Sequence, residues 1–353
     1  MTRREGDASV ICGLGSSLPT RVVTNEDLTA AGLDTTDEWI TRRTGISERR
    51  WAEEAVSTGD LATAAGRSAL ESADSPDADL VLVATSTPDR PLPATAPDVA
   101  HRLGLNHCPA FDMAAVCTGF LYALVAADAL VQAGRYSRIL VIGAETYSRI
   151  IDPRDRDTAA IFGDGAGAVL LRPGNADEPG AIGAAVLASD GARSDLIKVT
   201  AGGARLPHGD TIRPREERFF QMQGKPVFQN AVARMTEASR AVLESRRWPA
   251  DSVEVFIGHQ ANQRILTAVA SRLGIPETAR YGNIRDVGNT AAASIPLAMA
   301  HAVRHQPPRR GARTVLTAFG GGLTWGAVTL TWPAVRTVDR PPEHRPDTKE
   351  STG

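Results

Sequence analysis

The same succession of segments occurs twice in this chain. A strand, an Ala-rich helix and two further strands are expected in "DADLVLVATSTP", "CTGFLYALVAADALVQAG", "RILVIGAETY" and "AAIFGDGAGAVLL". The order returns in "DSVEVFIGHQAN", "NTAAASIPLAMAHAV" and "RTVLTAFGGGLTWGAVTL". Such internal similarity indicates a duplicated unit. We expect two related halves, residues 1–176 and 177–332, with the seam in "RPGNADEPG".

Short runs rich in Val, Ile and Leu alternate with longer segments of helical spacing, which indicates an α/β protein with buried strands. The helix that begins near residue 117 carries a broad apolar face and is predicted to end at Gly134. The last stretch, residues 333–353, is Pro-rich, charged and poor in large apolar residues, so it is predicted to be a flexible tail.

Composition narrows the class of protein. The formal net charge is −2 and no polybasic segment occurs, so a nucleic-acid partner is not expected. The N-terminal segment lacks the apolar core of a signal peptide, and no apolar run approaches the roughly 18 residues that span a membrane. We therefore expect a cytosolic protein without a membrane partner. Three cysteines without CxxC spacing argue against a disulfide framework and a cysteine-based zinc site.

Cys117, in "AAVCTGFLYAL", lies where an apolar segment ends and a helix begins. A cysteine in a core is commonly inert. At a helix N-terminus, however, the free N–H groups and the helix dipole favour the thiolate, which is the nucleophilic form. Cys117 is therefore a candidate nucleophile.

Three further positions carry candidate chemistry. His259 follows an apolar strand, where ligand sites of α/β proteins gather, although a lone histidine there is often structural. Asn289 precedes the second Ala-rich helix and could simply cap it. "FGGGLTW" could be only a tight turn, but bare glycine backbone such as Gly321 can also offer an N–H to an oxyanion.

Together, "DEWITRRTGI", "FDMAAVCTGF", "IFGDGAGAVL", "GHQANQRI", "GNTAAASIP" and "FGGGLTWG" resemble the β-ketoacyl-acyl carrier protein synthase III family of the thiolase superfamily. The resemblance runs from about residue 10 to residue 332, in the family's order. It implies a thiolase-like five-layered αβαβα fold built from two duplicated halves, and a homodimer. It implies no cofactor, because acyl-CoA and malonyl-acyl carrier protein are the substrates.

The resemblance also implies the roles of the candidate residues. Cys117 would take a starter acyl group from acyl-CoA, while the N–H groups of Cys117 and Gly321 stabilise the oxyanion. His259 and Asn289 would then hydrogen-bond the malonyl thioester carbonyl during decarboxylation, and the carbanion would attack the acyl group on Cys117. The product would be a 3-oxoacyl-acyl carrier protein, made in fatty-acid initiation or polyketide priming.

Binding residues follow from the same resemblance. Trp39, Arg43 and Arg156 match positions that hold CoA, as a stacking surface and as cations. Arg264 and Arg272 match basic positions that dock the carrier protein. The sequence departs from the family's docking residues at two positions: Gln229 stands where a lysine is common, and Lys225 where an asparagine is common. Both departures affect the expected strength of docking or the identity of the carrier.

Leu92 lies in "TPDRPLPATAP", which corresponds to a segment that crosses the dimer interface and helps close the partner's acyl pocket. It is smaller than the aromatic residue found in some members, which permits a roomier pocket.

Three alternatives stay open. A non-decarboxylating acyltransferase of the same fold would move an acyl group to an alcohol, an amine or a carrier protein, but the intact pair of His259 and Asn289 favours condensation. A catalytically silent subunit would have lost the nucleophile, which this chain keeps. A cysteine hydrolase would use Cys117 with His259 and would need water at the thioester.

Overall fold

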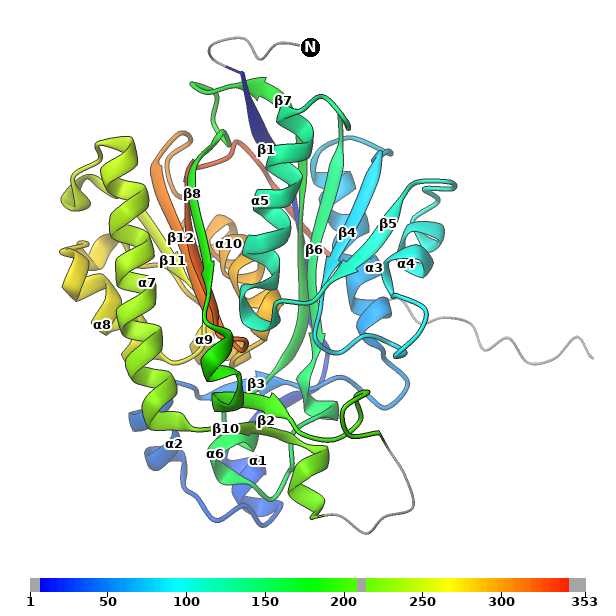
Figure 1. Cartoon of the computed structure of the whole chain (residues 1–353), viewed down its shortest axis with the longest axis vertical. Helices are drawn as coiled ribbons and strands as arrows, with labels where there is room; N and C mark the ends of the chain where they lie inside the picture. Colours follow the sequence, from blue (N-terminus) through cyan, green and yellow to red (C-terminus); the bar gives the residue numbers. More distant parts are fainter. Residues whose placement is uncertain (1–6, 208–213, 343–353) are drawn as a thin grey trace, which may run out of the picture.

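Two mixed β-sheets lie face to face, with helices between them and on both outer sides (Figure 1). The computed structural model describes residues 7–207 and 214–342. The larger sheet contains, in spatial order, β14 (Thr337–Asp339), β1 (Asp7–Ser17), β7 (Asp164–Asn175), β6 (Ile139–Thr146), β4 (Leu80–Ala84) and β5 (Ala110–Met113). The smaller sheet contains β11 (Val255–Gly258), β12 (Arg313–Gly320), β13 (Thr324–Thr331) and β8 (Ile182–Ser189).

The two sheets repeat one topology. In the larger sheet β4 runs parallel to β6, and β7 runs antiparallel to both β6 and β1. In the smaller sheet β11 runs parallel to β12, and β13 runs antiparallel to both β12 and β8. The repeated order that the sequence shows is therefore a repeated fold. The boundary between residues 176 and 177 stays a prediction, supported by the fact that β7 and β8 lie on either side of it.

Helices complete five layers, αβαβα, as the sequence predicts (Figure 1). The central layer consists of α5 (Gly119–Gln132) and α10 (Ser294–His305), while the outer layers consist of α3 (Thr58–Ser72) with α4 (Ala96–Arg102), and of α7 (Gly224–Arg246) with α8 (Gln263–Leu273). Helix α5 lies between two sheets, which explains why it is apolar on a broad face: Phe120, Leu121 and Leu124 are buried there. The chain turns at Gly134, whose φ of 66° suits glycine.

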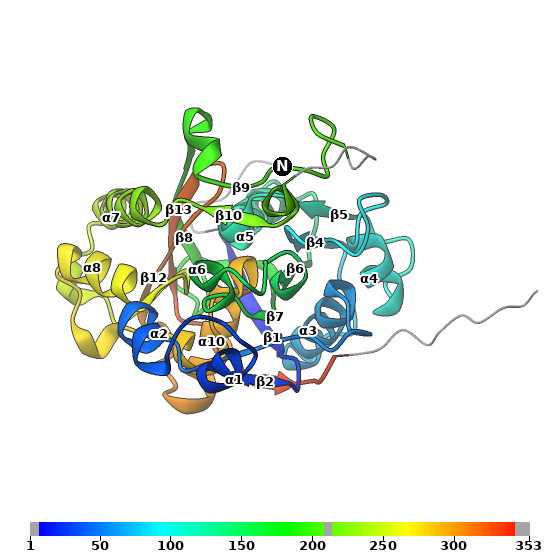
Figure 2. The ribbon, with the colours of Figure 1, turned by 90° about the horizontal axis from the view of Figure 1, so that it is seen from below.

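Smaller elements cover one end of these layers. They are α1 (Asn25–Ala30), α2 (Asp37–Thr44), α6 (Arg156–Ala159), α9 (Ile284–Val287) and two two-stranded antiparallel sheets, β2 (Val22–Thr24) with β3 (Glu48–Arg50) and β9 (Ile197–Val199) with β10 (Phe220–Met222). Figure 2 looks at the molecule from this end and shows α1, α2, α6 and β10 across it. The N-terminal ends of the two central helices, α5 and α10, therefore both lie beneath these smaller elements.

The predicted tail is partly wrong. Residues Thr337–Asp339 form β14, which pairs in parallel with β1 at the edge of the larger sheet. Arg336 and Arg340 bind Asp74 and Glu71, which fastens the strand to the end of α3. The local composition did not predict this strand, because the strand with which it pairs is more than 300 residues away in the sequence. Residues 343–353 lie outside the described residues.

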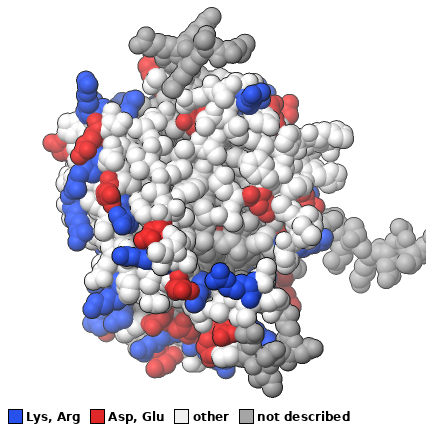
Figure 3. Space-filling view, viewed as in Figure 1, with Lys and Arg blue, Asp and Glu red and all other residues white. Residues whose placement is uncertain are grey.

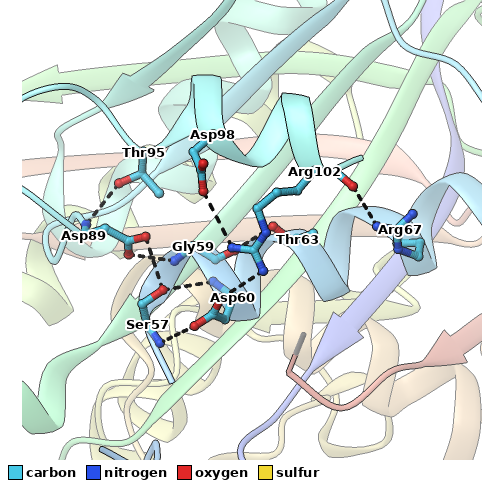
Figure 4. A network of polar contacts seen from close by, with 9 residues as sticks. All are labelled: Ser57, Gly59, Asp60, Thr63, Arg67, Asp89, Thr95, Asp98 and Arg102. Carbon is cyan, nitrogen blue, oxygen red and sulfur yellow. Dashed lines mark hydrogen bonds and ion pairs between the residues drawn. The ribbon is translucent and has the colours of Figure 1, made fainter. Parts of the chain in front are cut away.

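A polar network fixes the segment that carries Leu92 (Figure 4). The carboxylate of Asp89 accepts hydrogen bonds from Gly59 N–H (2.8 Å) and Ser57 Oγ (3.2 Å) at the start of α3. The Asp89 N–H donates to Thr95 Oγ1 at 3.1 Å. Residues 89 and 95 are therefore both anchored, while Leu92 between them is 85% exposed.

Candidate active site

Two equivalent turns bring the halves together. The 3₁₀ turn η1 (Val116–Thr118) precedes α5, and the 3₁₀ turn η7 (Ala291–Ala293) precedes α10. Each begins with a non-glycine residue of positive φ, 47° at Val116 and 44° at Ala291. The two turns pack against each other. As a result Cys117 in η1 and Asn289 just before η7 lie at one end of the central layer, as the duplication predicts.

The Cys117 thiol lies in an apolar cluster with the aromatic side chains of Tyr147, Phe162 and Phe220, and keeps partial access to solvent. Burial raises the pKa of this thiol, and the nearby Glu145 carboxylate raises the pKa further, while the residue's own N–H lowers it. The expectation that the helix N-terminus would favour the thiolate is therefore corrected: desolvation and a like charge outweigh it, and the resting residue is a thiol.

Glycine backbone lies directly beside the nucleophile. A Cβ added to Gly320 would lie 2.9 Å from the Cys117 nitrogen, a distance that side-chain carbons do not tolerate. Thr118 Oγ1 and Thr324 Oγ1 are 2.7 Å apart, which ties η1 to the β12–β13 turn. Among the described residues, no main-chain carbonyl accepts a hydrogen bond from the N–H of Cys117 or of Gly321, and the Cys117 N–H interacts only with its own sulfur. Two main-chain donors are thus left for a ligand oxygen.

His259 follows β11 at its carboxyl end, as predicted, and its side chain is buried. Its Nδ1 lies 2.7 Å from Ser294 Oγ, and that oxygen also accepts a 3.3 Å hydrogen bond from the Gln260 N–H. In the tautomer with the ring proton on Nε2, the Ser294 hydroxyl donates to Nδ1. Burial lowers the pKa of His259 to about 3, so the ring is neutral near pH 7.

The Asn289 side chain is held in one orientation. Its Oδ1 accepts a 2.9 Å hydrogen bond from the Ala291 N–H, so the amide caps the turn η7 as an N-cap would. Its main chain pairs with Ile161 and Gly163. Within the described part of the chain neither Nδ2 of Asn289 nor Nε2 of His259 has a hydrogen-bond partner. Each residue therefore keeps one free donor.

Asn289 is among the residues that line a cavity of about 680 Å³. Trp39, Arg43 and Arg156 line it, as predicted for one binding site. The guanidinium carbons of Arg43 and Arg156 lie 4.7 Å and 5.2 Å from the Trp39 ring centroid. An aromatic ring in contact with two cations suits a ligand with a flat ring and anionic groups.

Of the two residues predicted to dock the carrier protein, one lines this cavity and the other does not. Arg264 lines the same cavity, with its guanidinium carbon 5.6 Å from the Phe228 ring, and so do Lys225 and Gln229. Arg272, in the last turn of α8, does not line it. Figure 3 shows Lys and Arg mixed with Asp and Glu along the side of the molecule formed by α7 and α8. Leu92 lies neither in the cavity nor on α8; it belongs to the segment beside β5.

The sequence analysis missed several residues that hold the site. Ser294 and Gln260 orient His259 and the segment before Asn289, where Gln260 Oε1 accepts from the N–H of Asn283 at 3.1 Å. Buried Arg49 binds the carbonyls of Val23 and Ala160, so it joins the segments near α2 and α6. Only Ser294 and Gln260 stood within quoted motifs, and their spacing alone does not show which atoms meet.

No helix among the described residues is long and apolar enough to cross a membrane.

Comparisons with known proteins agree with this geometry. The models of 3-oxoacyl-[acyl-carrier-protein] synthase III and of its C-terminal region match residues 111–191 and 243–332. The β-ketoacyl-[acyl-carrier-protein] synthase III 3 of Streptomyces coelicolor is 54% identical, over 94% of this chain and 99% of its own.

Two solved structures are also similar. The 3-oxoacyl-(acyl carrier protein) synthase III of Pseudomonas aeruginosa PAO1 has a TM-score of 0.86 and 47% identity, over 93% of this chain and 99% of its own. The priming β-ketosynthase of the R1128 polyketide pathway has a TM-score of 0.87 and 34% identity, over 94% and 98% of the two chains. Because the identity is high and extends over nearly the whole length, this chain belongs to the 3-oxoacyl-[acyl-carrier-protein] synthase III family, acyltransferases of the thiolase superfamily.

Proposed function

We propose that the protein condenses a starter acyl group with malonyl-acyl carrier protein to give a 3-oxoacyl-acyl carrier protein. The observation that carries the proposal is the arrangement of free donors: two main-chain N–H groups beside Cys117, and one side-chain donor each on His259 and Asn289. A condensation with two oxyanionic intermediates needs donors at two places.

The first half-reaction is acyl transfer to Cys117. The sulfur attacks the thioester carbonyl of acyl-CoA, and the N–H groups of Cys117 and Gly321 stabilise the tetrahedral oxyanion. The carbon–sulfur bond to CoA then breaks, CoA leaves as its thiol after taking up a proton, and an acyl-enzyme remains. Trp39, Arg43 and Arg156 bind the CoA nucleotide in the cavity.

The second half-reaction is decarboxylative condensation. Nε2 of His259 and Nδ2 of Asn289 donate to the malonyl thioester oxygen, where negative charge develops as CO2 leaves. A neutral histidine serves here as a donor, which agrees with its lowered pKa. The enolate carbon attacks the acyl carbonyl on Cys117, the carbon–sulfur bond breaks, and the departing thiolate takes up a proton from solvent, which restores the resting thiol. No cofactor is expected to take part.

The carrier protein and a second copy of the chain are proposed partners. Arg264 and Arg272 both lie on α8 and would contact the carrier. Strand β5 is an edge strand with an exposed Phe111, and the exposed Leu92 precedes helix α4, which packs on β5. Unpaired edges of this kind invite pairing with another chain. Figure 3 shows few charged residues over this part of the molecule. We propose a homodimer through β5 in which Leu92 reaches the partner's acyl pocket, and a cytosolic location.

Intact-protein mass spectrometry tests the first half-reaction. Wild type and Cys117→Ala are incubated with a panel of acyl-CoAs before any malonyl donor is added. The expected result is a mass gain of one acyl group in the wild type alone, which also identifies the preferred starter. An equal gain in Cys117→Ala would refute the role of the thiol.

Labelled malonyl-acyl carrier protein is then added, and release of 14CO2 is measured. Release coupled to loss of the acyl adduct supports condensation. Transfer of the adduct to another acceptor without CO2 would instead identify a non-decarboxylating acyltransferase.

A further inference from the structure

Glu145, at the end of β6, is a buried acidic residue to which the condensation assigns no role. It forms no ion pair or hydrogen bond with a Lys, Arg or His within the described residues. A carboxylate without a buried cation is costly unless donors surround it. The hydrogen-bond donors and titratable groups around the Glu145 carboxyl therefore determine when it is charged.

Hydroxyl and amide donors converge on this carboxylate from residues 85–87. They are Thr85 Oγ1 at 3.3 Å, the Ser86 N–H at 3.0 Å, Ser86 Oγ at 3.1 Å and Thr87 Oγ1 at 2.7 Å. Strand β6, which carries Glu145, packs against the turn η7 that follows Asn289: a Cβ added to Gly143 would clash with the Ala292 carbonyl oxygen. Glu145 thus fixes the loop after β4 on a strand that supports the turn after Asn289.

Two titratable groups lie near Glu145: Tyr147, which begins η2 (Tyr147–Arg149) two residues further along the chain, and Cys117 of η1, which packs in one apolar cluster with Tyr147. The charge of Glu145 raises the pKa of both. All three become anionic when they lose a proton, so ionisation of one opposes ionisation of the others. Burial raises the pKa of Glu145 to about 7, and burial raises the pKa of Tyr147 well above its ordinary value. Near neutral pH the carboxyl is therefore the member whose charge changes first.

We propose that Glu145 is a positioning residue that controls the ionisation of Cys117, by fixing residues 85–87 where β6 packs on the turn η7, and by opposing the thiolate whenever its own carboxyl is charged. With the carboxyl neutral, the thiol loses its proton more readily. With the carboxyl charged, the thiolate forms less readily, and the resting nucleophile is protected from adventitious electrophiles. The inference rests on the proposed nucleophilic role of Cys117.

Alkylation of Cys117 by iodoacetamide tests the proposal, with the modified site located by peptide mapping, since Cys12 and Cys108 are also free. The reaction reports on the thiol whether or not it accepts an acyl group, so failure here is distinguishable from failure of the proposed function. The logarithm of the wild-type rate should rise with pH, flatten above about pH 7, where the carboxyl ionises, and rise again. In Glu145→Gln the flattening should be absent.

The expected signature is a pH-dependent ratio of rates. Glu145→Gln and wild type should agree within about twofold at pH 5.5, whereas the variant should react at least about tenfold faster at pH 8.5, the change that one pKa unit produces. Asp164→Asn is the matched control, because Asp164 is also a buried carboxylate with raised pKa that accepts from Ser148. Its profile should match the wild type.

A merely structural role would accelerate alkylation equally at every pH, so parallel profiles for Glu145→Gln and wild type would overturn the proposal. Ser86→Ala provides an independent test if Glu145→Gln does not fold. Loss of the Ser86 hydroxyl removes one donor to the carboxylate and should move the flattening to higher pH. An unmoved profile in Ser86→Ala would equally count against it.

Discussion

Ser294 Oγ lies 2.7 Å from Nδ1 of His259 and accepts from the Gln260 N–H, and in the tautomer that the proposed role requires its hydroxyl donates to Nδ1 while the ring proton is on Nε2. Ser294→Ala removes this control. Decarboxylation should slow about fivefold, in line with roughly 1 kcal/mol for one hydrogen bond, while acylation of Cys117 stays within about twofold. Ser294→Thr keeps the hydroxyl and should restore much of the rate. The acyl adduct and the release of 14CO2 are measured separately. Equal loss of both in Ser294→Ala would contradict a role of Ser294 that is specific to decarboxylation.

Asn289→Ala should separate the two half-reactions more sharply. The variant still forms the acyl-enzyme but should release CO2 at least about 10²-fold more slowly, the usual loss for one oxyanion donor. The Oδ1 bond to the Ala291 N–H is lost as well, so circular dichroism must show an intact fold. The division of roles fails if acylation falls as far as decarboxylation.

Arg156→Ala should weaken binding of acyl-CoA rather than catalysis. Loss of one cation beside the Trp39 ring is expected to raise KM for acyl-CoA about fivefold, from ~1 kcal/mol, with kcat little changed. Arg42→Ala is the control, since exposed Arg42 pairs with Glu38 and does not line the cavity. A similar KM in both variants would place CoA elsewhere.

Gly320→Ala should damage the nucleophile's surroundings. The added carbon would meet the Cys117 nitrogen at 2.9 Å and its Cβ at 3.1 Å, so η1 or β12 must shift. We expect a loss of about 1–3 kcal/mol in the free energy of unfolding, typical of overpacking, and a strong loss of acylation. Gly203→Ala, with no atom within 4 Å of the added carbon, should change neither. If Gly320→Ala were acylated as fast as the wild type, the close approach of Gly320 to the Cys117 main chain would be contradicted.

Acid should destabilise the protein through His259. Its pKa in the folded state is about 3, below the ordinary 6.5, so the unfolded chain binds a proton that the folded chain does not. The free energy of unfolding should therefore fall as the pH drops from about 6.5 towards 3, by up to about 1.4 kcal/mol per pH unit from this residue. Urea unfolding at pH 6.5, 5.5 and 4.5 measures the slope. His259→Asn should flatten it, and an unchanged slope would exclude His259 as a source.

The sequence by itself determined the layered architecture and the place of the catalytic candidates. The repeated order of apolar segments implies two like sheets, and Cys117, His259 and Asn289 each stand at an element end that local patterns identify. Contacts between distant segments are not encoded locally. Tertiary structure alone decided that β14 pairs with β1, that Ser294 orients His259, and that Glu145 faces Cys117. It also reversed the expected effect on the Cys117 thiol, because desolvation depends on everything packed around a group rather than on its neighbours in the chain.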